Sequence, residues 1–271
     1  KRSQVAGQVT FFCIGTGNEA ASAGHTSGRI ISEGEETIQL AIQSRQSSIS
    51  IQIWKEYTDQ IEISIINPSG VRVGPVPEIL GPHRFRIGQT EILLYYGEPS
   101  PYSISQEIYI DLLPVESYLT EGIWRIVLSA GKIVTGQYEM WLPSDNVLNR
   151  GTGFLFPTDA TTLTIPSSAS RAISVGAYDA RTFAYADFSG RGEKINRENR
   201  LMFADSKPDL AAPGVDLLVP ASEGSTQRVS GTSFATPLVS GAAALLMEWG
   251  IEKGNDPYLY GEKLKAYLRK G

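Results

Sequence analysis

The sequence is poor in three features that would each point to a familiar class of protein. It has one cysteine, Cys13, so the chain can hold neither an internal disulfide nor a zinc site built from cysteines. Its net charge of -5 argues against non-specific nucleic-acid binding, which requires a basic surface. No apolar run reaches the ~18 to 20 residues of a membrane span. With 271 residues, 41% of them hydrophobic, the composition is that of a globular protein of one or two domains.

The middle of the chain, residues 32–145, alternates apolar and polar residues with a period of two. The alternating residues are Ile38, Leu40 and Ile42; Ile49, Ile51 and Ile53; Ile61, Ile63 and Ile65; Ile92, Leu94 and Tyr96; Ile108, Ile110 and Leu112; Ile123, Ile126 and Leu128; and Tyr138, Met140 and Leu142. Turn-forming stretches such as Asn67–Gly70 and Gly97–Ser100 separate these segments. Short strands at this spacing predict an antiparallel β-sandwich of the jelly-roll type.

The flanking parts, residues 1–31 and 146–271, have the pattern of an α/β domain. Val9–Ile14 and Ala172–Ala177 are continuous apolar runs, typical of strands buried on both faces in a parallel sheet. The sequence therefore predicts a discontinuous α/β domain, made of these two parts and interrupted by the sandwich.

Two helices are expected in the C-terminal part. Gly231–Trp249 is rich in small residues, which let a core helix lie close to a sheet. Pro257–Gly271 carries Leu264 at helical spacing with other apolar residues, which predicts an amphipathic helix. We expect its basic residues to form a solvated face; they are Lys263, Lys265, Arg269 and Lys270.

The strongest local signal is Gly231–Pro237, Gly-Thr-Ser-Phe-Ala-Thr-Pro, at the start of the first helix. A serine in the first turn of a helix holds its own N–H near its oxygen, and the helix dipole adds partial positive charge there. That arrangement suits a nucleophile whose attack creates an oxyanion. From position alone, Thr232 and Ser233 could be merely capping residues, as most serines and threonines at helix starts are.

The whole string resembles the nucleophile motif of the subtilisin-like serine proteases, Gly-Thr-Ser-x-Ala-Ser/Thr-Pro. Three more segments resemble that family in the same order along the chain. They are Gly15–Glu19 (Gly-Thr-Gly-Asn-Glu), Ala172–Tyr178 with Phe188 and Ser189, and Lys207–Gly214 (Lys-Pro-Asp-Leu-Ala-Ala-Pro-Gly). The resemblance implies that Ser233 is the nucleophile and that Asn18 contributes to the oxyanion hole. It also implies that Thr16 and Gly17 form one wall of the substrate site.

The catalytic Asp and His motifs of that family precede its Asn segment, and this chain begins about 17 residues before Asn18. Neither motif is present. The resemblance therefore implies two partners from the same protein, an N-terminal segment that bears Asp and His and a prodomain, besides a protein substrate. His83 is expected in an exposed loop. His25 follows the Asn segment, so a catalytic role stays open, although it lacks the His-Gly-Thr context. In the matching family segments, Asp187, Asp209 and Asp216 are structural.

The interrupting sandwich, with Gly24–Ile30 and Ala243–Ile251, resembles the clostridial Csp subtilases of spore germination. This resemblance implies the processing of a spore cortex-lytic proenzyme, and a spore-associated location. Some members of that group are pseudoproteases, so a non-catalytic binding or regulatory protein is the alternative. Ser233 and Asn18 are both present, which favours an active protease.

No cofactor is assigned. Many subtilases bind calcium, but the sequence has no Asp-x-Asp-x-Asp-Gly loop at which to place it. The sandwich region also carries aromatic residues that could line a carbohydrate site or pack within and across its strands. They include Trp54, Tyr95, Tyr96, Tyr102, Trp124 and Trp141.

Overall fold

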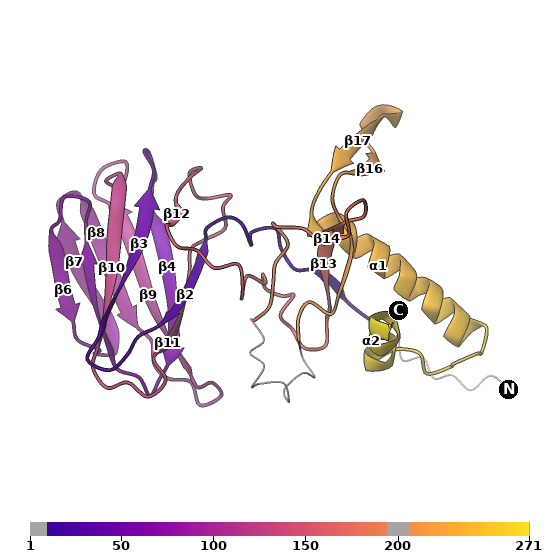
Figure 1. The fold of residues 1–271 in the computed structure, drawn as a ribbon, viewed down its shortest axis with the longest axis horizontal. Coiled ribbons are helices and arrows are strands. Elements are labelled where there is room, and N and C mark those ends of the chain that lie inside the picture. The colour runs from indigo at the N-terminus through magenta and orange to yellow at the C-terminus, as the bar shows by residue number, and fades with distance from the viewer. Residues whose placement is uncertain (1–9, 194–205, 271) are drawn as a thin grey trace. The chain divides into compact units, whose positions relative to one another are not determined.

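The computed structural model describes residues 10–193 and 206–270. The chain divides into two compact units. The sandwich unit is Ser22–Thr158, and the α/β unit combines Lys1–Ala21 with Asp159–Gly271. The division expected from the sequence placed the boundaries at residues 31/32 and 145/146, about ten residues inside those of the sandwich unit. Figure 1 labels the strands and helices of both units.

Two antiparallel sheets form the sandwich unit. The six-stranded sheet has the order β2 (His25–Arg29), β11 (Gln137–Trp141), β4 (Ile49–Glu56), β9 (Ser105–Pro114), β8 (Thr90–Tyr96) and β7 (Gly81–Ile87). The five-stranded sheet has the order β12 (Gly153–Phe154), β3 (Glu35–Ile42), β10 (Gly122–Ala130), β5 (Ile61–Ile66) and β6 (Arg72–Val76). Each sheet sends alternate residues inward, as the period of two predicted.

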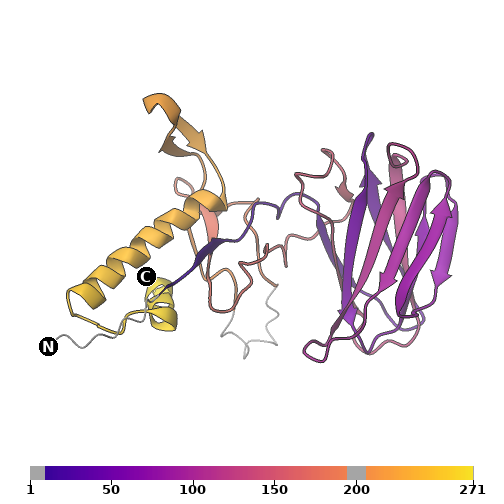
Figure 2. The ribbon, with the colours of Figure 1, turned by 180° about the vertical axis from the view of Figure 1, so that it is seen from behind.

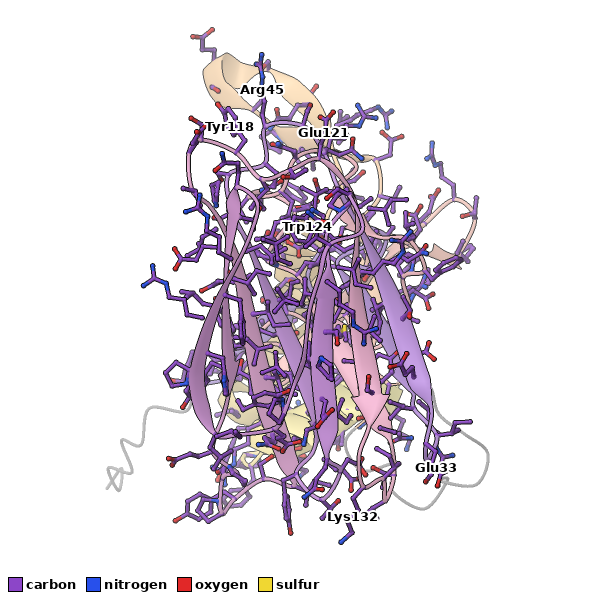
Figure 3. All side chains as sticks on the ribbon, turned by 90° about the vertical axis from the view of Figure 1, so that its left-hand side faces the viewer. Glu33, Arg45, Tyr118, Glu121, Trp124 and Lys132 are labelled. Carbon is purple, nitrogen blue, oxygen red and sulfur yellow. The ribbon has the colours of Figure 1, made fainter. Side chains whose placement is uncertain are left out.

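One continuous apolar core lies between these sheets. Leu40 and Ile126 from the five-stranded sheet and Ile51 and Ile110 from the six-stranded sheet are all buried in it. Trp124, which Figure 3 labels within the sandwich, is 1% exposed and donates Nε1–H to the carbonyl of Thr120. The expectation that Ile123 points inward is wrong. Ile123 is exposed, and its neighbour Trp124 takes the core position.

A small, mostly parallel sheet forms the centre of the α/β unit. Its parallel strands are β1 (Cys13–Gly15), β13 (Ile173–Asp179) and β15 (Leu210–Pro213), with β13 in the middle. The strand β14 (Ala184–Tyr185) pairs antiparallel with the end of β13. A separate hairpin consists of β16 (Leu217–Pro220) and β17 (Thr226–Val229), joined through the short turn Ser222–Gly224. The expected strand at Val9–Ile14 begins outside the described residues, and its described end is β1.

The helix α1 (Thr232–Met247) packs on this sheet through its small residues. Ala235, Val239 and Ala243 form the buried side of the helix. A wider helical turn, Glu248–Glu252, continues α1. The stretch Thr232–Glu252 is long and apolar enough to cross a membrane by length and composition alone, which the absence of an unbroken apolar run in the sequence did not indicate. Because it packs on the strands, we interpret it as the core helix of this unit; Figure 2 shows it from behind.

The C-terminal helix α2 (Gly261–Lys270) buries Leu264, as its amphipathic pattern predicted. The expectation that its basic residues are all solvated is wrong for Lys265. This side chain is 6% exposed and forms an ion pair with Asp209, at 2.9 Å between Nζ and Oδ1. The helical pattern places Lys265 beside the apolar face of the helix. It does not indicate that the buried carboxylate of Asp209 lies next to that face.

Candidate active site at the start of helix α1

Ser233 is the second residue of α1, and it is exposed. Gly231, which precedes the helix, has φ 151°, a backbone conformation that glycine adopts easily and other residues rarely do. A Cβ atom at Gly231 would also lie 3.2 Å from Nδ2 of Asn18. The glycine of the motif therefore lets the chain turn sharply into the helix next to the Asn18 side chain.

Asn18 lies at this helix start, although it is far from it in the sequence. Its Oδ1 accepts a hydrogen bond of 2.8 Å from the backbone N–H of Thr232. The bond satisfies one of the first-turn N–H groups that have no partner inside the helix. It also fixes the orientation of the amide, whose Nδ2 has no partner among the described residues. The Asn18 amide thus keeps a free donor beside the first turn.

Close packing of β1 against α1 holds the two segments together. A Cβ atom at Gly15 would lie 2.8 Å from Oγ1 of Thr232, so only glycine fits there without a shift. The Gly17 N–H donates to the same Oγ1, at 3.2 Å. Thr232 is 2% exposed, and its carbonyl accepts a hydrogen bond of 2.8 Å from Oγ1 of Thr236. Thr232 therefore acts as the fixed point between the Asn18 segment and the helix.

Thr16 and Gly17, the expected wall of the substrate site, are held from behind by the segment around Ser189. The buried Thr16 shares a hydrogen bond of 3.3 Å with Oγ of Ser189. Its backbone N–H donates to Val175, and its carbonyl accepts from Thr164. A Cβ atom at Gly190 would lie 2.3 Å from the Thr16 carbonyl oxygen. Thr16 therefore offers no free polar group, and only its position can shape a substrate site.

No general base stands beside Ser233 in the described part of the chain. Its hydroxyl and its N–H have no hydrogen-bond partner within residues 10–193 and 206–270. The α/β unit contains no histidine, because both histidines of the chain belong to the sandwich unit.

The two histidines occupy structural positions in the sandwich unit. His25 is the first residue of β2 and only 3% exposed; its Nε2 lies 2.6 Å from Oε2 of Glu139. Its Nδ1 lies 2.9 Å from Oγ1 of Thr158. The expectation that His83 sits in a loop is wrong, since His83 lies in β7 and its ring Nε2 is 2.8 Å from the carbonyl of Ile79. The polar, alternating sequence of β7 gave no strong strand signal.

Asp209 forms a buried network that braces the α/β unit. Its Oδ2 accepts hydrogen bonds from the N–H and hydroxyl of Ser174 and from Nζ of Lys207, and its Oδ1 faces Nζ of Lys265. Burial alone would raise the pKa of Asp209, but these donors hold the pKa below its usual value. The network ties β13, β15 and α2 together, in keeping with the structural role implied for Asp209.

No group of three or more His, Cys, Asp and Glu side chains in the described ranges could hold a metal ion.

Comparisons with known proteins agree with this arrangement. The model of the subtilase family matches residues 125–270, more than half of the chain. The chain belongs to the subtilase family. Two curated subtilases similar to it are the serine protease AprX of Bacillus subtilis and proteinase R of Parengyodontium album. AprX is 31% identical over 42% of this chain and 27% of its own length, and proteinase R is 40% identical over 27% and 20%.

A solved subtilase, the CspB protease of Clostridium perfringens, has a similar structure. The TM-score is 0.88 and the identity 35%, over 96% of this chain and 53% of the CspB chain. The subtilisin-like α/β fold predicted from the motifs is confirmed. This subtilase chain spans about half of CspB and about a quarter of AprX.

Proposed function

We propose that this chain is the C-terminal part of a serine endopeptidase that hydrolyses peptide bonds by acyl transfer. One observation carries the proposal, the 2.8 Å hydrogen bond from the Thr232 N–H to Oδ1 of Asn18. It joins the nucleophile motif to the Asn segment, two motifs that lie at opposite ends of the sequence. Membership of the subtilase family supports the reaction class.

In the proposed mechanism, Oγ of Ser233 attacks the carbonyl carbon of a peptide bond. A histidine from the upstream segment of the same protein accepts the serine proton and then passes it to the leaving amine. The negative charge that develops on the carbonyl oxygen is stabilised by the Ser233 N–H and by Nδ2 of Asn18. Both donors have no other partner among the described residues, and the positive end of the α1 dipole adds to their effect.

Thr16 and Gly17 are proposed as one wall of the substrate site. Gly17 has φ 96°, and a Cβ atom there would lie 2.5 Å from Cγ2 of Thr164. Glycine is therefore needed for the chain to pass between Thr16 and Asn18. The backbone at Gly17, rather than the buried Thr16 side chain, would border the substrate.

An upstream segment and a prodomain of the same protein are the proposed partners. Large apolar side chains on α1 are exposed in this chain, among them Leu238 at 50% and Leu245 at 68%. Exposed apolar surface of this kind marks a site that another element covers. The CspB chain is about twice as long as the part that matches, which leaves room for such a segment.

The proposed substrate is a spore cortex-lytic proenzyme, in line with the resemblance to the Csp subtilases and with the structural match to CspB.

We further propose that the sandwich is an insert of the jelly-roll type. The nested pairing of β3 with β10 and of β4 with β9 supports this topology. Calcium binding remains without an assigned site.

A second candidate is a non-catalytic binding or regulatory protein with a subtilase scaffold. The observation that favours it is the absence of histidine from the α/β unit. Upstream Asp-Ser/Thr-Gly and His-Gly-Thr motifs in the gene product would decide for the protease, and their absence would decide for the binding protein.

The test is peptide hydrolysis by the protein with its upstream segment in place. Ser233→Ala should lower kcat by about 10⁶-fold, the loss measured for the triad serine of subtilisin. Ser225→Ala changes an exposed serine in the hairpin of the same unit and serves as the matched control, with unchanged kcat. If both variants keep the activity of the parent protein, Ser233 is not the nucleophile and the proposal fails.

A further inference from the structure

The outer face of the six-stranded sheet carries a line of aromatic side chains. Tyr95 on β8 lies opposite Tyr109 on β9, Tyr109 lies opposite Gln52 on β4, and Gln52 lies opposite Trp141 on β11. Directly opposed residues share one face of a sheet, so these four side chains form one row across four strands. We call them the aromatic row. Trp54 lies two residues from Gln52 on β4, on the same face.

These rings lie outside the core. Tyr95 is 43% exposed, and the burial of Tyr109, Trp54 and Trp141 is intermediate. The structure thus separates the aromatic residues noted in the sequence into core, loop and outer-face residues. Tyr96 and Trp124 are core residues, Tyr102 is 97% exposed in a loop, and Trp54, Tyr95 and Trp141 share the outer face. Tyr109, which the sequence analysis did not single out, completes the row.

The five-stranded sheet provides an internal comparison. The outer positions of its strands β3, β10 and β5 carry no aromatic ring. They are Glu35, Thr37, Gln39, Ala41, Ile123, Arg125, Val127, Ser129, Glu62, Ser64 and Ile66. Both sheets pack on the same core, so stability of the sandwich does not by itself require rings on an outer face. Among the strands compared, the aromatic side chains belong to the outer face of the six-stranded sheet and not to that of the five-stranded sheet.

Polar side chains without partners surround the rings. Gln52 lies within the row, Glu107 is opposite Trp54, and Asp111 lies two residues from Tyr109 on the same face. None of these three side chains forms a hydrogen bond or ion pair with a described residue. Oxygen acceptors and an amide donor are therefore free on the same surface as the rings.

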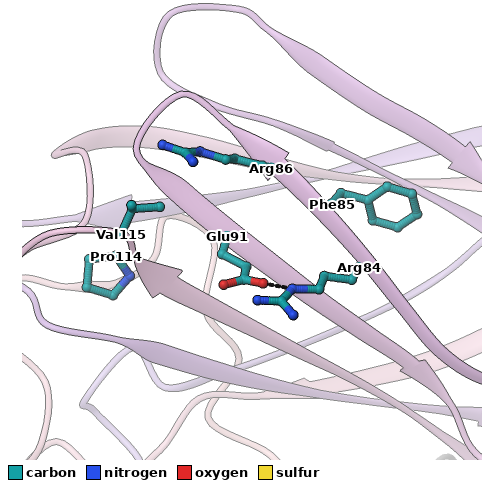
Figure 4. A pocket seen from close by; sticks show the side chains of 6 residues that line it. All are labelled: Arg84, Phe85, Arg86, Glu91, Pro114 and Val115. Atoms are coloured by element: carbon teal, nitrogen blue, oxygen red, sulfur yellow. Dashed lines mark hydrogen bonds and ion pairs between the residues drawn. The ribbon is translucent and has the colours of Figure 1, made fainter.

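Charged groups farther along this face form hydrogen bonds, and one of the two arginines forms an ion pair. Figure 4 shows the end of β7 and β8, where a hollow of ≈ 480 Å³ is lined by Arg84, Arg86 and Glu91. Nε of Arg84 donates to Glu91, and Arg86 donates to the carbonyl of Gly88. The cations are thus engaged, whereas the free charges beside the row are carboxylates. Anionic ligands are disfavoured there by like-charge repulsion.

We propose that the aromatic row binds a linear, uncharged polysaccharide. The apolar faces of sugar rings pack on Tyr and Trp rings, while sugar hydroxyls form hydrogen bonds with free carboxylates and amides. Adjacent strands lie ~4.8 Å apart, so the row from β8 to β11 extends over about 14 Å. That length suits a chain of several sugar units rather than one sugar.

The proposal is tested by titrating the whole 271-residue chain with soluble, uncharged oligosaccharides. The probes are hexamers of β-1,4-glucose, α-1,4-glucose and N-acetylglucosamine at up to millimolar concentration, followed by calorimetry and tryptophan fluorescence. At least one hexamer should bind, and a hexamer of galacturonic acid should not. Tyr95→Ala and Tyr109→Ala should each weaken binding about tenfold or more.

Tyr102→Ala is the matched control, because it removes an exposed tyrosine of the same unit that lies outside the row; it should leave binding unchanged. Circular dichroism melting shows whether each variant is folded, and Tyr95, the most exposed ring of the row, is the substitution least able to disturb the fold. The proposal is overturned if no neutral hexamer binds. It is also overturned if Tyr102→Ala weakens binding as much as the row variants do.

Discussion

The two units of this subtilase differ in how fully each one buries its own apolar surface. The sandwich unit has one continuous core to which both sheets contribute. The α/β unit has two small clusters, one between α1 and the sheet and one beside α2. Its helix α1 leaves Leu238 and Leu245 exposed, although the buried side of the helix fits the sheet closely. The sandwich thus buries its apolar residues in one core, whereas the α/β unit leaves large apolar side chains of α1 exposed.

Polar groups show the same contrast. In the sandwich unit, the carboxylate of Asp59 accepts four hydrogen bonds, from the N–H groups of Val134, Thr135 and Gly136 and from the Thr135 hydroxyl. In the α/β unit, the hydroxyl of Ser233 and the Nδ2 group of Asn18 have no hydrogen-bond partner among the described residues, although Oδ1 of Asn18 accepts from the Thr232 N–H. These unpaired groups lie where the chemistry is proposed.

The largest effect should appear on separating the units. Residues 22–158 alone should show a cooperative thermal transition, because their core is self-contained and of domain size. The shorter fragment 32–145 lacks β2 and β12 and should melt at lower temperature. Residues 159–271 alone should not fold cooperatively. Differential scanning calorimetry checks this, and a transition in the α/β fragment but not in the sandwich fragment would reverse the comparison.

Removing the Asp209 carboxylate should strongly destabilise the α/β unit. Asp209→Ala leaves Lys207 and Lys265 charged and buried without their partner, which typically costs about 3–5 kcal/mol. Asp256→Ala, which breaks the exposed pair with Lys263, is the control and should cost much less. Chemical denaturation of the 271-residue chain measures both. Equal effects of the two variants would show that the buried network does not brace the unit.

Asn18 should contribute to catalysis more than to stability in the completed protein. Asn18→Ala removes one oxyanion donor and should lower kcat about 10²–10³-fold with little change in KM, as for the corresponding residue of subtilisin. Asn18→Asp keeps an oxygen to accept from Thr232 but loses the Nδ2 donor, so it should preserve stability and still lose activity. His25→Ala, in the other unit, should change kcat and KM by less than about tenfold. A silent Asn18→Ala would contradict the proposed oxyanion hole.

Both units should lose stability in acid through different carboxylates. The pKa values of Asp59 and Asp209 are lowered: burial would raise them, but hydrogen bonds to the ionised carboxylates outweigh it. A lowered folded pKa gives stability that is present above the unfolded pKa of about 3.9 and is lost as the pH falls through the folded value. Melting curves between neutral pH and about pH 2 should therefore show reduced acid sensitivity of the sandwich in Asp59→Asn and of the α/β unit in Asp209→Asn. Unchanged pH profiles in both variants would contradict this assignment.

Regular patterns made much of the fold predictable. Ile38, Leu40 and Ile42 alternate cleanly, and the structure buries all three, because strand geometry turns a period of two into one apolar face. Where two apolar residues are adjacent, as Ile123 and Trp124 are, the pattern does not say which of the two points into the core. Packing against the neighbouring strands places Trp124 there. Lys265 and Asp209 are 56 positions apart, so no local pattern could indicate their buried contact.

The candidate site depended on motif resemblance rather than on periodicity. No spacing rule brings Asn18 to Thr232, and only the recurrence of both motifs in one family suggested that they meet. His25 follows the Asn segment closely, yet β2 carries it into the sandwich unit, because strand pairing with β11 determines its place. Sequence proximity therefore did not indicate where His25 lies, whereas the two motifs that contain Asn18 and Thr232 do meet in the structure.

The most direct test of the account is labelling of Ser233 by a fluorophosphonate probe, with and without the upstream segment. A serine without a general base is a weak nucleophile at neutral pH, so the 271-residue chain alone should remain unlabelled. The protein that includes the upstream segment should be labelled at Ser233, and Ser233→Ala should abolish the signal. Strong labelling of the 271-residue chain alone, or labelling of the completed protein at another residue, would contradict the account.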